Sequence, residues 1–307
     1  MSDWTAILKT NPIPKLLEIG ELGLTNRIQR DLLDKKTGLA KEPVVDDSEY
    51  KTLVRRQKPD GSWREAGRKK NELNWTFITT LRSLYRLIDL GSRSGDEVFD
   101  RGAAFILGTQ TEIGDFRGAY GPDIPSPDYT GMTVEVLFHG KCNCNKALIR
   151  ALEWLVEARR NDGGWAIPGL RSQSKKDPSS HNVTGMALRG FAAEPNGQFS
   201  DEAKKAGELL ANRIFEPDKY PHRRGVEYWG KLSYPFWFTD ALSALDVLSR
   251  LSFDLSTGKM QRAFDWLIKQ QDKDGFWHSD FRKNRMSADP WLTYAALRTI
   301  KAIINNE

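Results

Sequence analysis

A threonine that recurs at a nearly constant interval is the feature that most constrains how this chain can fold. Five threonines, each followed by an apolar run with helical spacing, are separated by 54, 54, 55 and 54 residues. They are Thr76, Thr130, Thr184, Thr239 and Thr293. Self-similarity at such an interval is typical of stacked supersecondary units, because one unit cannot bury its apolar face alone. The period therefore predicts a repeat protein.

Each repeat is predicted to be a helical hairpin. The stretch from Thr239 to Leu248 is apolar on almost every side, which indicates a helix buried on most of its surface. The stretch from Gln261 to Gln270, upstream of the next threonine, is amphipathic, as expected of an outer helix with one face in solvent. The hairpins could stack into an open solenoid or close into a ring. Aromatic residues just before the inner helices favour a ring with an aromatic-lined mouth.

The turns between the helices carry a more specific pattern. Residues 262–277 contain Arg, Ala, Trp, Leu, Gln, Gly and Trp at the spacing of the QW motif of triterpene cyclases. Residues 101–116 match with Phe116 in the last place, and residues 150–165 match with Arg159 in the Gln place. Residues 57–63 hold a partial copy, and the hairpin around Lys205 has lost the motif. The Gln side chain is expected to bind backbone at neighbouring helix ends, which makes it part of the scaffold.

On these motifs, residues 48–307 resemble the superfamily of squalene and oxidosqualene cyclases and prenyltransferase β-subunits. The resemblance implies an all-α fold, an α/α toroid in which about six hairpins close around a central cavity. We expect one domain over residues 1–307. Residues 48–307 would supply five hairpins of about 54 residues, and residues 1–47 would form the helical segment that completes the ring.

The resemblance also indicates where an acid could act. Class II cyclases of this superfamily carry a D-x-D-D run directly before the threonine of one inner helix, and its middle carboxyl protonates an alkene or epoxide. This chain has no D-x-D-D run. At the equivalent place, two residues before the repeat threonine, the one acidic residue is Asp128, and Asp289 stands alone four residues before Thr293. Asp128 is the candidate acid, with His181 as its candidate assisting group. Asp128 is also interpretable as a plain helix N-cap.

Substrate-binding residues are predicted at the mouths of the inner helices. The aromatic candidates are Trp75, Tyr129, Phe236, Trp237 and Trp291, whose ring faces could stabilise carbocations. Arg223 and Arg224 could hold a diphosphate at the cavity mouth, or they could be ordinary solvated loop charge.

No cofactor and no metal are expected. His139, Cys142 and Cys144 could form a local metal site, but two cysteines in a surface loop are the preferred interpretation. Their spacing rarely permits an unstrained disulfide, which favours a reducing cytosol. The start of the chain has no secretory signal, and no apolar run is long enough to span a membrane. The net charge of +5 is modest, so we expect no nucleic-acid partner, and peripheral membrane contact stays open.

Three functions fit these observations. The first is a terpene-cyclase-like enzyme that acts on an isoprenoid by acid-initiated carbocation cyclisation. The second is a non-catalytic protein that binds an isoprenoid or another lipid-like molecule in the same cavity. The third is a prenyltransferase-type subunit that needs a partner chain. The absence of the full acidic motif keeps the second hypothesis close to the first, since a fold does not fix a function.

Overall fold

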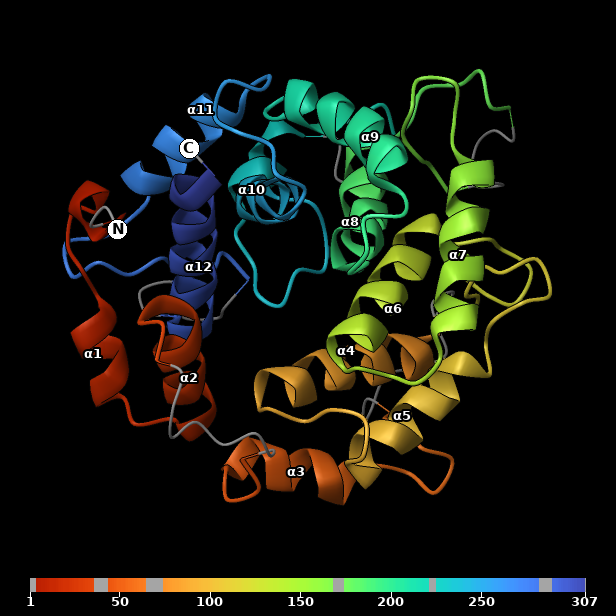
Figure 1. Cartoon of the computed structure of the whole chain (residues 1–307), viewed down its shortest axis with the longest axis horizontal. Coiled ribbons are helices and arrows are strands. Elements are labelled where there is room, and N and C mark those ends of the chain that lie inside the picture. The colour runs from red at the N-terminus through yellow and green to blue at the C-terminus, as the bar shows by residue number, and fades with distance from the viewer. Residues whose placement is uncertain are drawn as a thin grey trace. The chain divides into compact units, whose positions relative to one another are not determined.

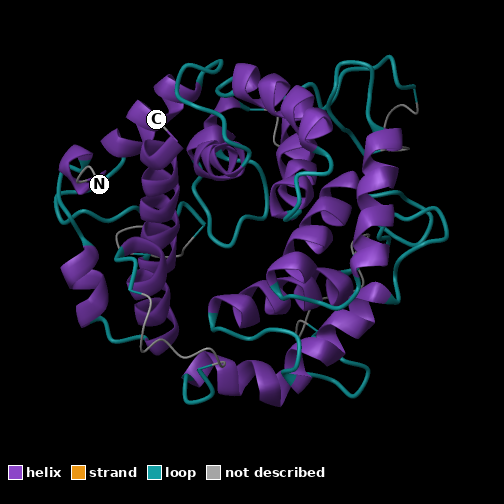
Figure 2. Cartoon of the chain, viewed as in Figure 1, coloured by secondary structure: helices purple, strands orange, loops and turns teal. Residues whose placement is uncertain are grey.

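Helices form every regular element of the described structure, a computed structural model that describes residues 4–35, 44–64, 74–167, 174–220, 225–281 and 289–306. Within these residues Figure 2 shows helices and loops and no strand. The predicted all-α class, built from helical hairpins as in α/α toroids, is confirmed. The chain divides into two compact units. A central unit holds Ala40–Ala203, and a terminal unit joins Met1–Leu39 with Lys204–Glu307.

The central unit consists of three consecutive hairpins. Their outer helices are α3 (Ser48–Arg56), α5 (Glu97–Leu107) and α7 (Asn145–Ala158), and their inner helices are α4 (Trp75–Asp89), α6 (Pro127–His139) and α8 (His181–Ala193). The inner helices α6 and α8 lie side by side (Figure 1). They approach so closely that a Cβ atom on Gly131 would lie 2.5 Å from the Cα of Ala187. Only glycine permits this crossing.

The terminal unit combines the two ends of the chain. It contains most of α9 (Ser200–Arg213), a short turn η3 (Val226–Gly230), α10 (Ala241–Arg250), α11 (Met260–Lys269) and α12 (Pro290–Asn306). The first residues contribute η1 (Trp4–Ile7), α1 (Ile13–Glu18), α2 (Leu22–Arg27) and η2 (Ile28–Leu32), and η1, α2 and η2 pack against α12. The single domain and the closed ring stay predictions.

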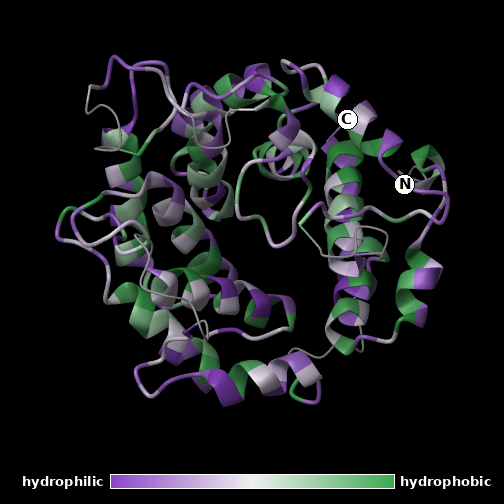
Figure 3. Ribbon diagram, turned by 180° about the vertical axis from the view of Figure 1, so that it is seen from behind, coloured by the Kyte–Doolittle hydropathy of each residue, from purple (hydrophilic) through white to green (hydrophobic). Residues whose placement is uncertain are grey.

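The contrast between inner and outer helices is as predicted. Every residue of α10 from Ala241 to Ser249 is buried, whereas α11 buries Met260, Ala263, Phe264 and Leu267, one stripe with helical spacing. Figure 3 shows hydrophilic and hydrophobic residues along the helices, coloured by hydropathy. No helix within the described ranges is long and apolar enough to cross a membrane.

In three of the five repeats the recurring threonine joins the preceding turn to its inner helix. The hydroxyl oxygens of Thr130, Thr184 and Thr293 accept hydrogen bonds of 3.0, 3.0 and 3.1 Å from backbone N–H groups of the preceding turn. In the first hairpin Thr80, and not the periodic Thr76, accepts this bond from Trp63. The prediction that the five threonines lie near helix starts is confirmed, and in the first repeat the buried bond falls one helical turn later.

In the first two hairpins the glutamine of the QW motif ties its turn to the next outer helix. Nε2 of Gln110 donates to the carbonyl oxygens of Gly114, in its own turn, and Ala147, at the start of α7, at 2.9 and 2.8 Å. Gln57 makes the same pair of bonds, to Gly61 and Val98. This is the scaffold role that the sequence predicted.

The same link connects the last hairpin to the beginning of the chain. Gln271 donates to Gly275 and also to the carbonyl oxygen of Thr10, at 2.8 and 2.7 Å. Gly275 has a φ of 92°, and a Cβ there would lie 2.7 Å from that oxygen. The segment before α1 therefore occupies the place that the next outer helix takes at the other junctions. This is where the predicted sixth hairpin was expected to pack.

The cysteine pair differs from the expectation. Lys141 adopts a left-handed φ of 54°, and this turn brings the Cα atoms of Cys142 and Cys144 to 5.3 Å. The two residues form a disulfide between α6 and α7. A disulfide was not expected from this spacing, but the turn shortens the Cα separation to a distance that a disulfide spans.

Candidate functional site

Asp128 lies in the first turn of α6, at a place set by its neighbours. Pro127 is the first helical residue, a position that suits its fixed φ and missing N–H, and Ser126 is the N-cap. Asp128 is therefore the second residue of the helix and not its cap. Its side chain is 1% exposed, and its Oδ1 has no hydrogen-bond partner. The N-cap interpretation is wrong for this residue.

Burial changes the acidity of this carboxyl group. Removal from water raises the pKa of Asp128 from 3.8 to about 6, because a low-dielectric environment penalises the charged form. The hydrogen bond from the Tyr120 hydroxyl opposes this rise in pKa, and the backbone N–H groups of Tyr129 and Asp128 oppose it as well. Neither N–H group forms a hydrogen bond with Oδ1. The net result is a carboxyl group that is half protonated near pH 6 and about one-tenth protonated at pH 7.

Other buried carboxyl groups in the described residues are engaged by several donors. Glu135, two turns further along α6, accepts from Arg189 of α8 at 2.7 and 3.0 Å and from the Tyr85 hydroxyl at 2.6 Å. Asp289 accepts from the backbone N–H of Leu292 and caps α12. Among the described carboxyl groups with a resolved shift, Asp128 has the one raised pKa.

Tyr120 is the functional neighbour that the sequence analysis missed. Its hydroxyl donates to Oδ2 of Asp128 at 2.6 Å, so the two carboxyl oxygens are in different environments. Tyr120 lies between Gly118 and Gly121, which have φ values of 133° and 118°. This glycine-flanked loop before α6 directs the tyrosine back toward the helix start. The two glycines are the sequence signal that could have indicated it.

The predicted partners of Asp128 are placed differently. His181, the candidate assisting group, begins α8 and is 4% exposed, and the hydroxyl that donates to Asp128 is that of Tyr120. Tyr129 packs edge-on against Tyr120 and Phe77, with ring centroids 5.5 and 5.9 Å apart. Asp128 therefore lies beside an aromatic cluster drawn from α4, the 117–126 loop and α6.

The other predicted aromatic residues lie in separate groups. Trp75, half-buried, starts α4 in the central unit, where the guanidinium of Arg82 lies 5.8 Å from its ring. In the terminal unit Trp291 stacks on Tyr234, which also contacts Phe236. Trp237 is half-buried. A shared cavity lining for these side chains stays a prediction.

Two further predicted sites have simple outcomes. Arg223 and Arg224 lie outside the described residues. Cys142 and Cys144 are oxidised in their disulfide and so cannot act as thiolate ligands with His139. Over the described ranges no group of three His, Cys, Asp or Glu side chains could hold a metal ion.

Known proteins resemble the chain in sequence. A squalene–hopene cyclase of Bradyrhizobium diazoefficiens is 25% identical over 194 residues, which cover 57% of this chain and 28% of that protein. A probable squalene–hopene cyclase of Sinorhizobium fredii is 26% identical over 149 residues, covering 44% and 22%. The superfamily resemblance is confirmed. The matched region spans about a quarter of each of these relatives. No family model matches the chain.

A solved structure with a similar arrangement is a type II terpene cyclase from Scytonema in complex with merosterolic acid A, its product. It has a TM-score of 0.49 and 12% identity, and the match covers 84% of this chain and 80% of that one.

Proposed function

We propose that this chain is a terpene-cyclase-like enzyme in which Asp128 protonates an alkene of an isoprenoid substrate. The observation that carries the proposal is the state of the Asp128 carboxyl group, which is buried, has a pKa of about 6 and leaves Oδ1 without a partner. A general acid must hold its proton near the working pH and present it to the substrate. Among the carboxyl groups with resolved shifts, Asp128 fits this requirement best.

Tyr120 orients the acid in this mechanism. Because its hydroxyl donates to Oδ2 at 2.6 Å, the proton of the neutral carboxyl resides on Oδ1. The proton passes from Oδ1 to one alkene carbon, the C=C π pair forms the new C–H bond, and a carbocation and the Asp128 carboxylate remain. The Tyr120 bond stabilises this carboxylate. Further double bonds attack the cation, the final cation loses a proton to solvent, and solvent reprotonates the Asp128 carboxylate, so the net reaction is an isomerisation.

The aromatic cluster supplies the second requirement of this chemistry. Phe77, Tyr120 and Tyr129 present ring systems next to the acid, and an aromatic face attracts a cation. A dry environment also protects a carbocation from capture by water. The same features favour a hydrocarbon substrate. Squalene, named for the two sequence relatives, is the first isoprenoid to test.

Incubation in D₂O tests the proposal directly. The purified chain is supplied with squalene or geranylgeranyl diphosphate, and the products are analysed by gas chromatography and mass spectrometry. We expect cyclised product with one deuterium from the initiating acid. Asp128→Asn should reduce its formation by roughly a hundredfold or more, the low end of what a positioned acid contributes. Tyr120→Phe should reduce it less.

Asp289→Asn is the matched control, because an asparagine oxygen can also cap α12. It should leave product formation unchanged. Full activity of Asp128→Asn would refute the assignment. A wild-type chain that binds these isoprenoids without forming any deuterated product would instead support a non-catalytic binding protein.

A further inference from the structure

The junction between the fourth and fifth hairpins lacks the side chain that closes the others. In the second hairpin the motif glutamine, Gln110, stands nine residues after Arg101. In the fourth hairpin the residue nine places after Lys205 is Ile214. Even Arg159, in the third hairpin, performs the glutamine's function, since it donates to the carbonyl oxygen of Glu202 in the next outer helix. Isoleucine has no donor, so this link cannot form.

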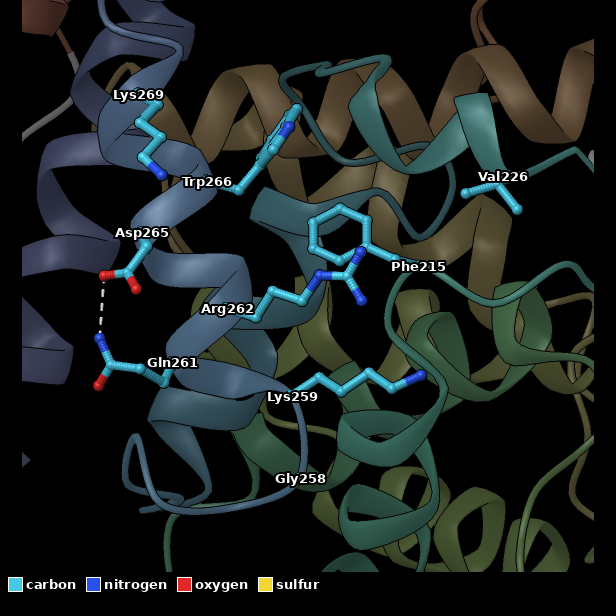
Figure 4. Close-up of a pocket in the computed structure, with 9 residues that line it drawn as sticks. All are labelled: Phe215, Val226, Gly258, Lys259, Gln261, Arg262, Asp265, Trp266 and Lys269. Carbon is cyan, nitrogen blue, oxygen red and sulfur yellow. Dashed lines mark hydrogen bonds between the residues drawn. The ribbon is translucent and has the colours of Figure 1, made fainter.

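A pocket of about 690 Å³ lies at this junction, on the outside of α11 (Figure 4). Its size is in the range of small-molecule sites. The apolar side chains that line it are Phe215, Val226 and Trp266, and the cationic ones are Lys259, Arg262 and Lys269. Phe215 has a left-handed φ of 64°, which is rare for a bulky residue, and its ring meets Trp266 at 5.7 Å.

Arg262 differs from the arginines at the equivalent place of the intact junctions. Arg101 donates to the carbonyl oxygen of Lys58 at 2.6 Å, and Arg150 donates to Oε1 of Gln110 at 2.7 Å. The Arg262 guanidinium lies over the Phe215 ring, 5.1 Å from its centroid (Figure 4). Within the described residues it is paired with no carboxylate, whereas the adjacent Lys259 is paired with Glu216.

We infer that this pocket binds a small amphipathic anion, an apolar or aromatic body that carries a phosphate or carboxylate. The guanidinium offers N–H donors in the fork geometry that both anions accept. Phe215, Trp266 and the 44% exposed Val226 cover the apolar part. The lining contains three cations and one carboxylate, Asp265. Lys259 is paired with Glu216, so one net positive charge remains to complement an anion. This site is separate from the acid site in the central unit and does not depend on the function proposed there.

Titration calorimetry of the full chain with 1-naphthyl phosphate tests the inference, with 1-naphthol and inorganic phosphate as matched probes. We expect the phosphate ester to bind more tightly than either probe, because only it uses both parts of the pocket. Arg262→Gln should weaken its binding about ten- to hundredfold, the effect of losing hydrogen bonds to a charged group. Arg101→Gln, the same change at an intact junction, should leave the affinity unchanged.

A second variant tests the location. Val226→Trp adds bulk at an exposed position and should block the pocket without disturbing the core. The inference would be overturned if naphthyl phosphate still bound to both Arg262→Gln and Val226→Trp. It would also be overturned if wild type bound naphthyl phosphate no more tightly than inorganic phosphate. Sedimentation with phosphatidic acid vesicles distinguishes the source of the anion. Loss of sedimentation in Arg262→Gln would identify a lipid headgroup, and a chain that binds naphthyl phosphate but not vesicles takes a soluble ligand.

Discussion

Replacing Asp128 with asparagine should change how the stability of the chain depends on pH. A pKa raised from 3.8 in the unfolded chain to about 6 in the folded chain corresponds to about 3 kcal/mol of folding free energy. Because the side chain is 1% exposed, solvent screening reduces this value little. Asparagine has nearly the same shape but does not ionise, so the substitution isolates the cost of the buried charge.

The direction of the effect follows from proton binding. Between about pH 4 and pH 6 the folded chain retains a proton on Asp128 that the unfolded chain has released, so raising the pH through this window favours unfolding. The penalty is absent below the unfolded pKa and complete above the folded one. The stability of Asp128→Asn relative to wild type should therefore rise by about 2 kcal/mol from pH 4 to pH 7.5, because about half a kcal/mol of the penalty is already present at pH 4.

Urea unfolding of both proteins across this range measures the change, and the intrinsic effect of the substitution cancels in the comparison between pH values. Tyr120→Phe is an informative second variant. The Tyr120 hydroxyl stabilises the Asp128 carboxylate, so its removal should raise the pKa of Asp128 further. In Tyr120→Phe the pH range over which stability falls should therefore extend to higher pH than in wild type. Parallel stability curves for wild type and Asp128→Asn would refute the reasoning, because they would show that Asp128 ionises as freely in the folded chain as in water.

Two further substitutions test the scaffold by urea unfolding. Gln271→Ala should lower the free energy of unfolding by about 1–3 kcal/mol, because it leaves the carbonyl oxygens of Thr10 and Gly275 without their donor. Gln270→Ala, at the exposed neighbouring position, should cost little. Equal losses in the two variants would contradict the link between the chain ends. Arg189→Met should cost about 3–5 kcal/mol, because the buried Glu135 loses its cationic partner, and adding Glu135→Gln should recover much of this loss. Purely additive losses would show that the pair is not coupled.

The helical hairpins and the QW links could be predicted from the sequence because each depends on local spacing. A period of about 54 residues and a glutamine nine residues after an arginine recur in the chain itself, and hydrogen bonds such as those of Gln110 and Gln271 follow from that repetition. The same reasoning placed the lone acidic residue, Asp128, at the start of an inner helix. It could not decide between a cap and an acid, since both need a carboxyl group in a first turn.

Tertiary structure decided what surrounds each of these groups. The loop at Gly118 and Gly121 brings Tyr120 onto Asp128, and burial raises the pKa of Asp128 to about 6 although the Tyr120 hydrogen bond opposes the rise. The turn at Lys141 closes the disulfide that the spacing alone disfavoured. The junction at Ile214 opens a pocket where a motif is missing. Desolvation and the reach of a hydrogen bond depend on groups distant in sequence, so a local pattern can identify a residue type and its helix but not its environment.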